Sequence, residues 1–340
     1  MRVLIHLFAI LTSLTGALCK HTEPHDLVTP QVVHTFPNGT SLENLAIRAS
    51  GEILCTVLSA PEIYQLDPIE NSSAKLVHSF PGYTSVLGIV EMQPDQFYVV
   101  AGNVTFATFS SVQGSWSAFH VNMSEFDING AATVTKVTDF PDALLLDGLG
   151  VLSREQGLVY VADIYAGVVS ILNVNTGDHY VAINNSLTVA GPPNFTSAGV
   201  NGVHVFEEPN GTLYLYFSNT AQSLLARIPI NANGTPAGEP EVVVSGIKVD
   251  DFTFDSDGNI LQAVLGSNEV AKINVTTKKV TIIAGNPSST ELMSVTSAQF
   301  GRLCDDEDTL YVTMNGANFS DIALVVPGAL KMLKLGPRLV

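Results

Sequence analysis

The sequence predicts an all-β protein, a six-bladed β-propeller whose four-stranded blades surround a central channel. Helical periodicity is scarce among the 340 residues. Short runs rich in β-branched and aromatic residues, bounded by Gly, Asn, Asp and Pro, dominate instead. One strand–turn–strand phrase also recurs six times, at intervals of roughly 40 to 60 residues, a period typical of propeller blades. Hydrophobic residues make up 46% of the chain, which is enough for a packed core.

Each copy of the phrase opens with a short strand, continues through a turn and ends with a second strand of the Leu-Tyr-Val type. The copies, each given as first strand and turn, are 43–47 with 50–51, 87–90 with 94–95, 147–151 with 155–157, 201–205 with 209–211, 250–254 with 256–258, and 297–301 with 305–308. The longest interval, between the second and third copies, leaves room for an extra hairpin around Trp116. The alternative, a β-sandwich or two β-domains, does not explain why one phrase recurs six times.

Residues 1–19 are predicted to be a secretory signal peptide, which leaves residues 20–340 as a single propeller domain. Arg2 supplies a positive charge, an apolar run follows, and Ala17 and Cys19 are small residues before the expected cleavage point. A membrane anchor is the alternative, but the apolar run is well short of the ~20 residues that cross a bilayer. We therefore expect a secreted protein with no membrane attachment after cleavage.

Asn-X-Ser/Thr sequons support the secretory route, because N-linked glycans are added there to asparagines on exposed turns. The sequence has more of them than chance placement explains, which predicts a glycoprotein. The sequons begin at Asn38, Asn71, Asn103, Asn122, Asn184, Asn194, Asn210, Asn233, Asn274 and Asn318.

Two cysteines, Cys55 and Cys304, remain after signal cleavage, one near each end of the mature chain. In an oxidising compartment they can pair, and a disulfide between them would tie the first structural unit to the last and close the ring. The alternative is two buried free thiols.

The charge balance argues against two classes of partner. Lys and Arg total 15 against 32 for Asp and Glu, so the formal net charge is −17. A nucleic acid or an anionic membrane would repel such a surface. Neither a nucleic acid nor an anionic membrane is therefore an expected partner, and the oligomeric state is not predicted.

Strands that open with Glu, with Asn-Gly and with Asp resemble those of the SMP-30/gluconolactonase/strictosidine-synthase-like family of six-bladed propellers. The resemblance covers roughly residues 35–330. Members of that family are lactonases or phosphotriesterases that hold one divalent cation, usually calcium, on a Glu, two Asn and an Asp at the central channel. The resemblance implies that Glu43, Asn201 and Asp250 occupy these positions, with Leu146 or Asp147 in the third blade.

Carboxylate and amide oxygens are the ligands that Ca²⁺ prefers. The chain nevertheless departs from the family pattern in the residues that flank Glu43 and Asp250, and the Asn of the third blade is missing. If Leu146 faces the channel, three protein ligands remain. In the alternative interpretation Asp147 and Asp250 cap strand ends and Asn201-Gly202 is a turn. The metal set that the resemblance implies is Glu43, Asp147, Asn201 and Asp250.

Three further side chains are candidates for catalysis: His204, Tyr165 and Asp163. His204 follows Asn201 by three residues, which puts the two side chains on opposite faces of an ideal strand, so it is either a pocket donor or a packed histidine. Tyr165 and Asp163 follow a predicted strand and lie at the channel mouth or in a turn. Trp116, the only Trp, contacts a ligand or anchors a surface loop. The predicted substrate pocket comprises Glu43, Asn201, His204, Asp250 and Trp116.

Three functions are open. The first is a calcium-dependent hydrolase of lactones or related esters, in which the ion polarises a carbonyl and an acid such as Asp250 acts on water. Another is a non-enzymatic propeller that binds a small molecule. The remaining function, which we favour because the cation motif is substituted, is that of a cycloaddition enzyme.

The cycloaddition function follows from a resemblance to secreted, glycosylated fungal members of the superfamily that act as hetero-Diels–Alderases in tropolone–sesquiterpenoid biosynthesis. Those enzymes join a quinone methide to a terpene. Such a reaction requires no cofactor. It needs an apolar cavity that holds both partners, and one hydrogen-bond donor to the quinone-methide oxygen.

Overall fold

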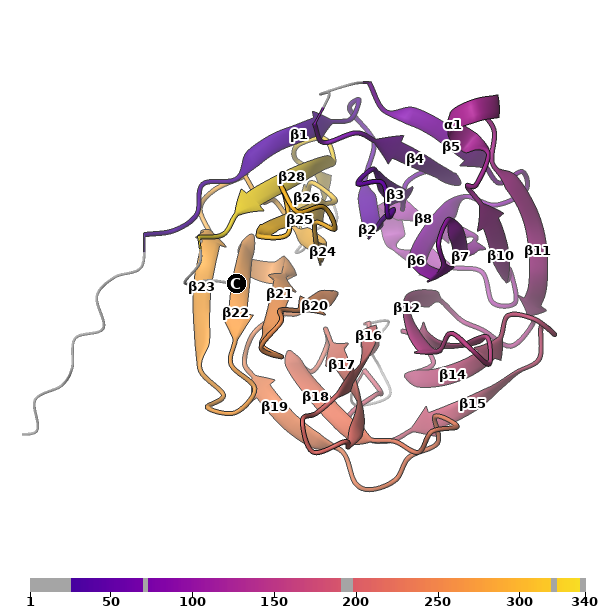
Figure 1. Cartoon of the computed structure of the whole chain (residues 1–340), viewed down its shortest axis with the longest axis vertical. Coiled ribbons are helices and arrows are strands. Elements are labelled where there is room, and N and C mark those ends of the chain that lie inside the picture. Colours follow the sequence, from indigo (N-terminus) through magenta and orange to yellow (C-terminus); the bar gives the residue numbers. More distant parts are fainter. Residues whose placement is uncertain (1–25, 70–72, 191–197, 319–322, 337–340) are drawn as a thin grey trace, which may run out of the picture.

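The computed structural model describes residues 26–69, 73–190, 198–318 and 323–336. Its main strands form six four-stranded antiparallel sheets, arranged as blades in a ring around a central channel (Figure 1). The predicted all-β, six-bladed propeller is confirmed. The predicted signal peptide lies outside the described residues, and so do the sequons at Asn71 and Asn194.

In the first five blades the strands follow one another in chain order from the channel outward (Figure 1). The first three blades are β2 (Leu42–Ile47), β3 (Ile53–Val57), β4 (Glu62–Leu66) and β5 (Lys75–Ser79); β6 (Ser85–Gln93), β7 (Gln96–Gly102), β10 (Trp116–Asn122) and β11 (Thr133–Phe140); and β12 (Leu146–Ser153), β13 (Leu158–Asp163), β14 (Val168–Asn173) and β15 (His179–Asn184). The next two are β16 (Val200–Glu207), β17 (Leu213–Asn219), β18 (Leu224–Pro229) and β19 (Glu241–Ser245); and β20 (Phe252–Phe254), β21 (Ile260–Val264), β22 (Glu269–Ile273) and β23 (Val280–Gly285). The first strand of each repeated phrase is therefore the inner strand of its blade.

The sixth blade joins the two ends of the chain. It consists of β24 (Val295–Phe300), β25 (Thr309–Met314), β28 (Ala329–Lys334) and β1 (Gln31–Thr35). β1 adds to the outer edge of the blade and pairs antiparallel with β28. Backbone hydrogen bonds between the first and last strands of the chain thus close the ring.

The structure contradicts the predicted disulfide between Cys55 and Cys304. Cys55 lies in β3 of the first blade, Cys304 lies between β24 and β25 of the adjacent sixth blade, and both thiols are free. Cys55 is completely buried among the apolar side chains of its blade, and this burial raises the pKa of the thiol, whereas Cys304 is exposed. The blades are neighbours as expected, but one sulfur belongs to the core and the other to the surface.

The extra hairpin between the second and third copies is present, but it does not contain Trp116. It is formed by β8 (Val104–Thr105), the 3₁₀ helix η1 (Phe106–Thr108) and β9 (Ser110–Ser111). Trp116 instead opens β10 and is fully buried, with its Nε1 donating to Leu144 O at 3.2 Å. The prediction that Trp116 lines a substrate pocket is therefore corrected, because its indole is a core group.

The remaining elements are short. They are the helix α1 (Phe126–Asn129), the 3₁₀ helix η2 (Leu265–Ser267) and a ribbon of β26 (Ala317–Asn318) and β27 (Ala323–Leu324). Within the described part of the chain, none of the helices has the length and hydrophobicity needed to cross a membrane.

The described sequons differ in their exposure. Four of the asparagines are exposed, as predicted: Asn38, Asn184, Asn210 and Asn233. The others are only half-exposed: Asn103, Asn122, Asn274 and Asn318. Asn274 shows the reason, because its Nδ2 donates a 2.8 Å hydrogen bond to Asn259 Oδ1. Glycosylation remains a prediction, and the structure favours the exposed group.

Candidate functional site

The inner strands share a bulge that positions the predicted site residues. In β2, β6, β12 and β16 the register with the next strand shifts just after the first one or two residues. A bulge bends a strand and re-aims its side chains, and bulges are common next to functional sites. Asn201-Gly202 is therefore part of a strand and not a turn. The bulged pairs are 43–44, 87–88, 147–148 and 201–202.

Buried threonines hold the carbonyl groups of the bulges across blade boundaries. Thr56 donates from Oγ1 to Leu87 O of the next blade at 2.6 Å. Thr296 and Thr313 of the sixth blade both donate to Glu43 O at 2.7 Å. Since each hydroxyl satisfies a carbonyl that the shifted ladder leaves without a strand partner, the bulges are fixed parts of the fold.

At the bulges and next to them, the predicted carboxylates form a buried acidic cluster of Glu43, Asp147 and Asp250. Burial raises the pKa of Glu43 well above its usual range, and the negative charges of Asp147 and Asp250 raise it further. Burial likewise raises the pKa of Asp147 and Asp250 well above their usual range. These carboxyl groups therefore keep their protons to higher pH than exposed acids do.

The third blade contributes Asp147, and not Leu146, to this cluster. Leu146 pairs with Asp163 in the strand ladder and packs in the apolar core. The Asp147 carboxylate instead accepts a long hydrogen bond of 3.4 Å from Asn44 Nδ2 of the first blade. The alternative that the sequence left open is thereby resolved.

The predicted calcium site stays a prediction. Two oxygens that such an ion would use, Asn201 Oδ1 and Asp250 Oδ1, are buried without a hydrogen-bond partner. Yet within the described ranges no three His, Cys, Asp or Glu side chains are grouped so that they could hold one metal ion. The predicted metal set is thus brought into one region, but its three carboxylates alone do not form a metal site.

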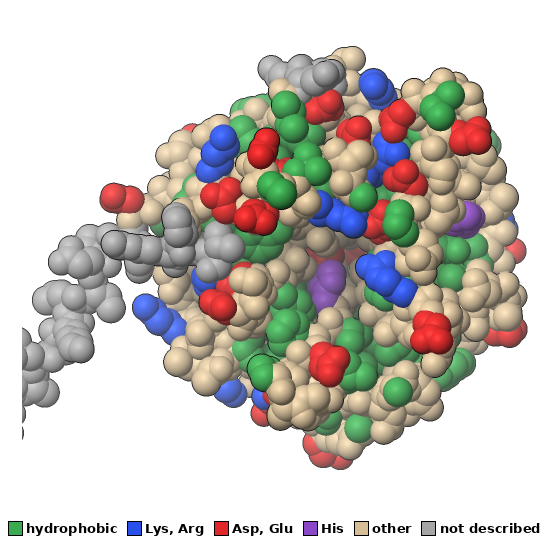
Figure 2. Space-filling model, viewed as in Figure 1, with side chains coloured by type: hydrophobic (Ala, Val, Ile, Leu, Met, Phe, Trp, Pro, Cys, Tyr) green, Lys and Arg blue, Asp and Glu red, His purple; other side chains and the backbone are tan. Residues whose placement is uncertain are grey.

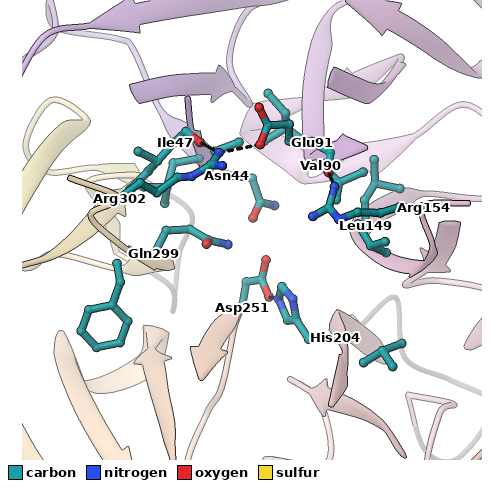
Figure 3. Close-up of a pocket in the computed structure, with 16 residues that line it drawn as sticks. Asn44, Ile47, Val90, Glu91, Leu149, Arg154, His204, Asp251, Gln299 and Arg302 are labelled. Carbon is teal, nitrogen blue, oxygen red and sulfur yellow. Dashed lines mark hydrogen bonds and ion pairs between the residues drawn. The ribbon is translucent and has the colours of Figure 1, made fainter. Parts of the chain in front are cut away.

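A cavity of about 420 Å³ opens along the later part of the inner strands. Figure 2 shows a hollow at the centre of the ring, with a histidine inside it and basic side chains at its edge. Its accessible lining is more polar than apolar, and one part of it, the apolar wall, is formed by Ile89, Val90, Leu149, Val151 and Val205. Figure 3 shows polar side chains that point toward its centre: Asn44, His204, Asp251 and Gln299.

Of the predicted pocket residues, His204 lines this cavity, whereas Glu43, Asn201 and Asp250 do not. Their positions in the cavity wall are taken by chain neighbours, Asn44 beside Glu43 and Asp251 beside Asp250. The bulge explains the difference, because successive residues of a strand point to opposite sides and a bulge shifts which residue faces the channel.

His204 and Asp251 form a hydrogen-bonded pair at the cavity. His204 Nε2 lies 2.8 Å from Asp251 Oδ1, and the imidazole packs edge-on against Phe252 with the ring centroids 4.8 Å apart. Asp251 Oδ1 also accepts the Phe252 backbone N–H at 2.8 Å. Among the described residues Nδ1 of His204 has no protein partner, so one ring nitrogen is held and the other is available to a ligand.

Gly202 permits this pairing. A Cβ added there would come within 2.2 Å of Asp251 Oδ1 and 2.8 Å of Asp251 Cα. The backbone N–H of Gly202 donates to Ser218 Oγ at 2.9 Å, which holds the bulge in place. The glycine of the Asn201-Gly202 pair therefore allows the fourth and fifth blades to pack closely.

The other two catalytic candidates are structural and are corrected here. The carboxylate of Asp163 accepts backbone N–H groups of Leu144, Leu145 and Ala166 at 2.8 to 3.1 Å, so it caps a turn. The Tyr165 hydroxyl donates to the Phe109 carbonyl oxygen. Neither side chain lines the cavity.

Two arginines at the cavity were missed. Arg302 binds Glu91 Oε2 at 2.5 Å and the Ile47 carbonyl at 2.7 Å, and Arg154 binds backbone carbonyls of the second blade (Figure 3). Arg154 directly follows inner strand β12, and Arg302 follows β24 after one residue. The sequence did carry a signal for these two arginines. Each is a basic residue just after a predicted inner strand, in a chain that has few Lys and Arg residues.

The chain is similar over most of its length to two fungal proteins, each of which carries the name "putative hetero-Diels-Alderase". The protein from Phoma sp is 27% identical over 338 residues, covering 90% of each chain. The protein from Sarocladium schorii is 26% identical over 325 residues, covering 85% of this chain and 78% of that protein. No family model matches the sequence.

Among solved structures, the chain resembles regucalcin, a calcium-binding protein from Agrobacterium tumefaciens. The TM-score is 0.62 at 16% sequence identity, over 91% of this chain and 94% of regucalcin. At this identity the likeness shows the six-bladed propeller fold alone. The predicted similarity to propellers of this kind, and to hetero-Diels–Alderases in sequence, is thus confirmed.

Proposed function

We propose that the protein is a biosynthetic enzyme that catalyses a hetero-Diels–Alder cycloaddition in the central cavity. The names of its relatives favour this reaction class. The observation that carries it is the cavity itself, which brings an apolar wall together with a hydrogen-bonded His204–Asp251 pair. The proposed partners are an oxygen-terminated heterodiene, such as a quinone methide derived from a tropolone, and the alkene of a terpene.

The apolar wall supports the proposal because a cycloaddition needs both partners held together more than it needs proton transfer. Val90, Val151 and Val205, which are partly exposed at the cavity, provide a surface for the terpene chain. Holding two reactants in a near-attack geometry gives effective molarities of up to about 10⁵–10⁸ M, which removes roughly 7–11 kcal/mol of barrier. New C–C and C–O bonds form, and no atom is lost.

His204 is the proposed donor to the heterodiene. In its protonated state the imidazole keeps Nε2–H on Asp251 and has a second N–H, at Nδ1, to donate to the heterodiene carbonyl oxygen. Negative charge grows on that oxygen as the alkene adds, so a fixed donor stabilises the transition state more than the bound substrate. Asp251, itself held by the Phe252 N–H, orients the ring.

The test is to fill the cavity. Val90→Phe places a larger side chain in the apolar wall, and we expect at least a tenfold loss of enzymatic cycloadduct formation, because a crowded cavity cannot hold both partners. Val181→Phe is the matched control, since Val181 is exposed on outer strand β15. Adduct is quantified by liquid chromatography after the heterodiene is generated in the presence of the alkene.

Two results would contradict the proposal. One is a wild-type rate no higher than the uncatalysed background. The other is equal turnover by the wild type and Val90→Phe at the same thermal stability, which would move the chemistry out of this cavity.

A further inference from the structure

Arg154 differs from the other arginines that the structure describes. Arg48 binds the carboxylates of Asp95 and Asp127, and Arg227 and Arg302 are likewise paired with glutamates. Within the described part of the chain Arg154 has no carboxylate partner. In a chain with a net charge of −17, it is a guanidinium whose charge is not neutralised, and it lines the cavity.

The contacts of Arg154 leave part of its guanidinium free. Nη1 alone is used, and it donates to Glu91 O at 2.5 Å and to Met92 O at 2.8 Å. Carbonyl groups fix the side chain without cancelling its charge. A guanidinium has five N–H donors, so those on Nε and Nη2 stay available, in the fork that matches two oxygens of one anion.

The neighbouring acids do not neutralise the Arg154 guanidinium. The Glu91 carboxylate binds Arg302 across the cavity mouth and also accepts the Asp95 backbone N–H at 3.0 Å. Asp251 is paired with His204 and lies apart from Arg154 in Figure 3. An anionic group would thus be attracted to the Arg154 side of the cavity, where the guanidinium has no carboxylate partner among the described residues.

We propose that Arg154 is a specificity-determining residue that binds an ionised oxygen group at one end of an otherwise apolar ligand. The ligand class is an apolar acid, whose carboxylate or acidic enol oxygen pairs with the Arg154 fork while its carbon skeleton contacts the apolar wall. The inference rests on the proposed function only in taking this cavity as the substrate site.

The test uses two probes of the same shape, 2-naphthoate and neutral 2-naphthamide, with Kd measured by calorimetry. For the wild type we expect the carboxylate to bind about tenfold more tightly than the amide. Arg154→Gln should bring the two affinities together by weakening naphthoate alone. Arg154→Lys should keep part of the difference, because it retains the charge but not the fork. Arg227→Gln, whose guanidinium lies outside the cavity, should behave as the wild type.

Three outcomes would overturn the inference. They are equal affinity of both probes for the wild type, absence of saturable naphthoate binding, and an Arg154→Gln variant that weakens both probes equally. The last would mean that Arg154 only ties the third blade to the second. Each readout is independent of cycloaddition, so a failed turnover assay would refute the proposed function without affecting this result.

Discussion

His204→Ala is expected to lower the rate of the enzymatic cycloaddition about 10²-fold, the usual loss when one positioned donor to a developing oxyanion is removed. The side chain contributes its Nδ1–H to the heterodiene oxygen, and no other cavity histidine is present among the described residues. Because the variant leaves the buried Asp251 carboxylate without its histidine partner, the melting temperature should also fall, and rates are compared at a temperature where both proteins are folded. Initial rates at saturating substrate measure the effect.

Two further variants separate chemistry from packing. Asp251→Asn keeps a hydrogen-bonding group but removes the charge that orients a protonated imidazole, so a smaller loss of rate is expected. His120→Ala is the control, because His120 stacks on Tyr98 in the second blade, outside the cavity. Turnover by His204→Ala at the wild-type rate would refute the assignment of His204 as donor.

Gly202→Ala is expected to have an effect of similar size for a different reason. The added Cβ would meet Asp251 Oδ1 at 2.2 Å and Asp251 Cα at 2.8 Å, and part of this contact is backbone that cannot rotate away. Overpacking of this kind costs about 1–3 kcal/mol of folding free energy. Displacing Asp251 by about 1 Å also moves His204, and a misplacement of that size costs up to about 10²-fold in rate.

Gly336→Ala is the matched control, since nothing lies within 4 Å of a Cβ at Gly336. Thermal melts and initial rates of both variants check the prediction. Wild-type stability together with wild-type turnover in Gly202→Ala would show that the close approach of Asp251 to β16 is not needed.

The fold was predictable because its signal is repeated and local. Each inner strand follows the same phrase, so even the weak sixth copy, 297–301, falls on β24. The positions of Glu43, Asp147, Asn201 and Asp250 near the channel were implied by the resemblance to the propeller family, which rests on the same repeated strands. Which of Leu146 and Asp147 joins the acidic cluster was not predictable, because this depends on a one-residue shift that the bulge introduces.

The site was harder to predict because its contacts are long-range. His204 was a candidate, but its partner Asp251 was not, since the sequence separates them by a whole blade. Trp116 and Tyr165 looked functional because of their residue types, yet both donate hydrogen bonds to backbone carbonyls of neighbouring segments. Cys55 shows the same limit, because its burial in the first blade depends on how the blade packs.

The most direct test of the central claim is chiral analysis of the cycloadduct made by the purified protein, with and without EDTA. The account predicts that one enantiomer dominates, that it forms faster than the racemic background, and that chelation changes neither rate nor selectivity. Racemic adduct at the background rate, or a selectivity that disappears with EDTA, would contradict a metal-independent cycloaddition in this cavity. Lactone hydrolysis that EDTA abolishes would instead favour a calcium-dependent hydrolase.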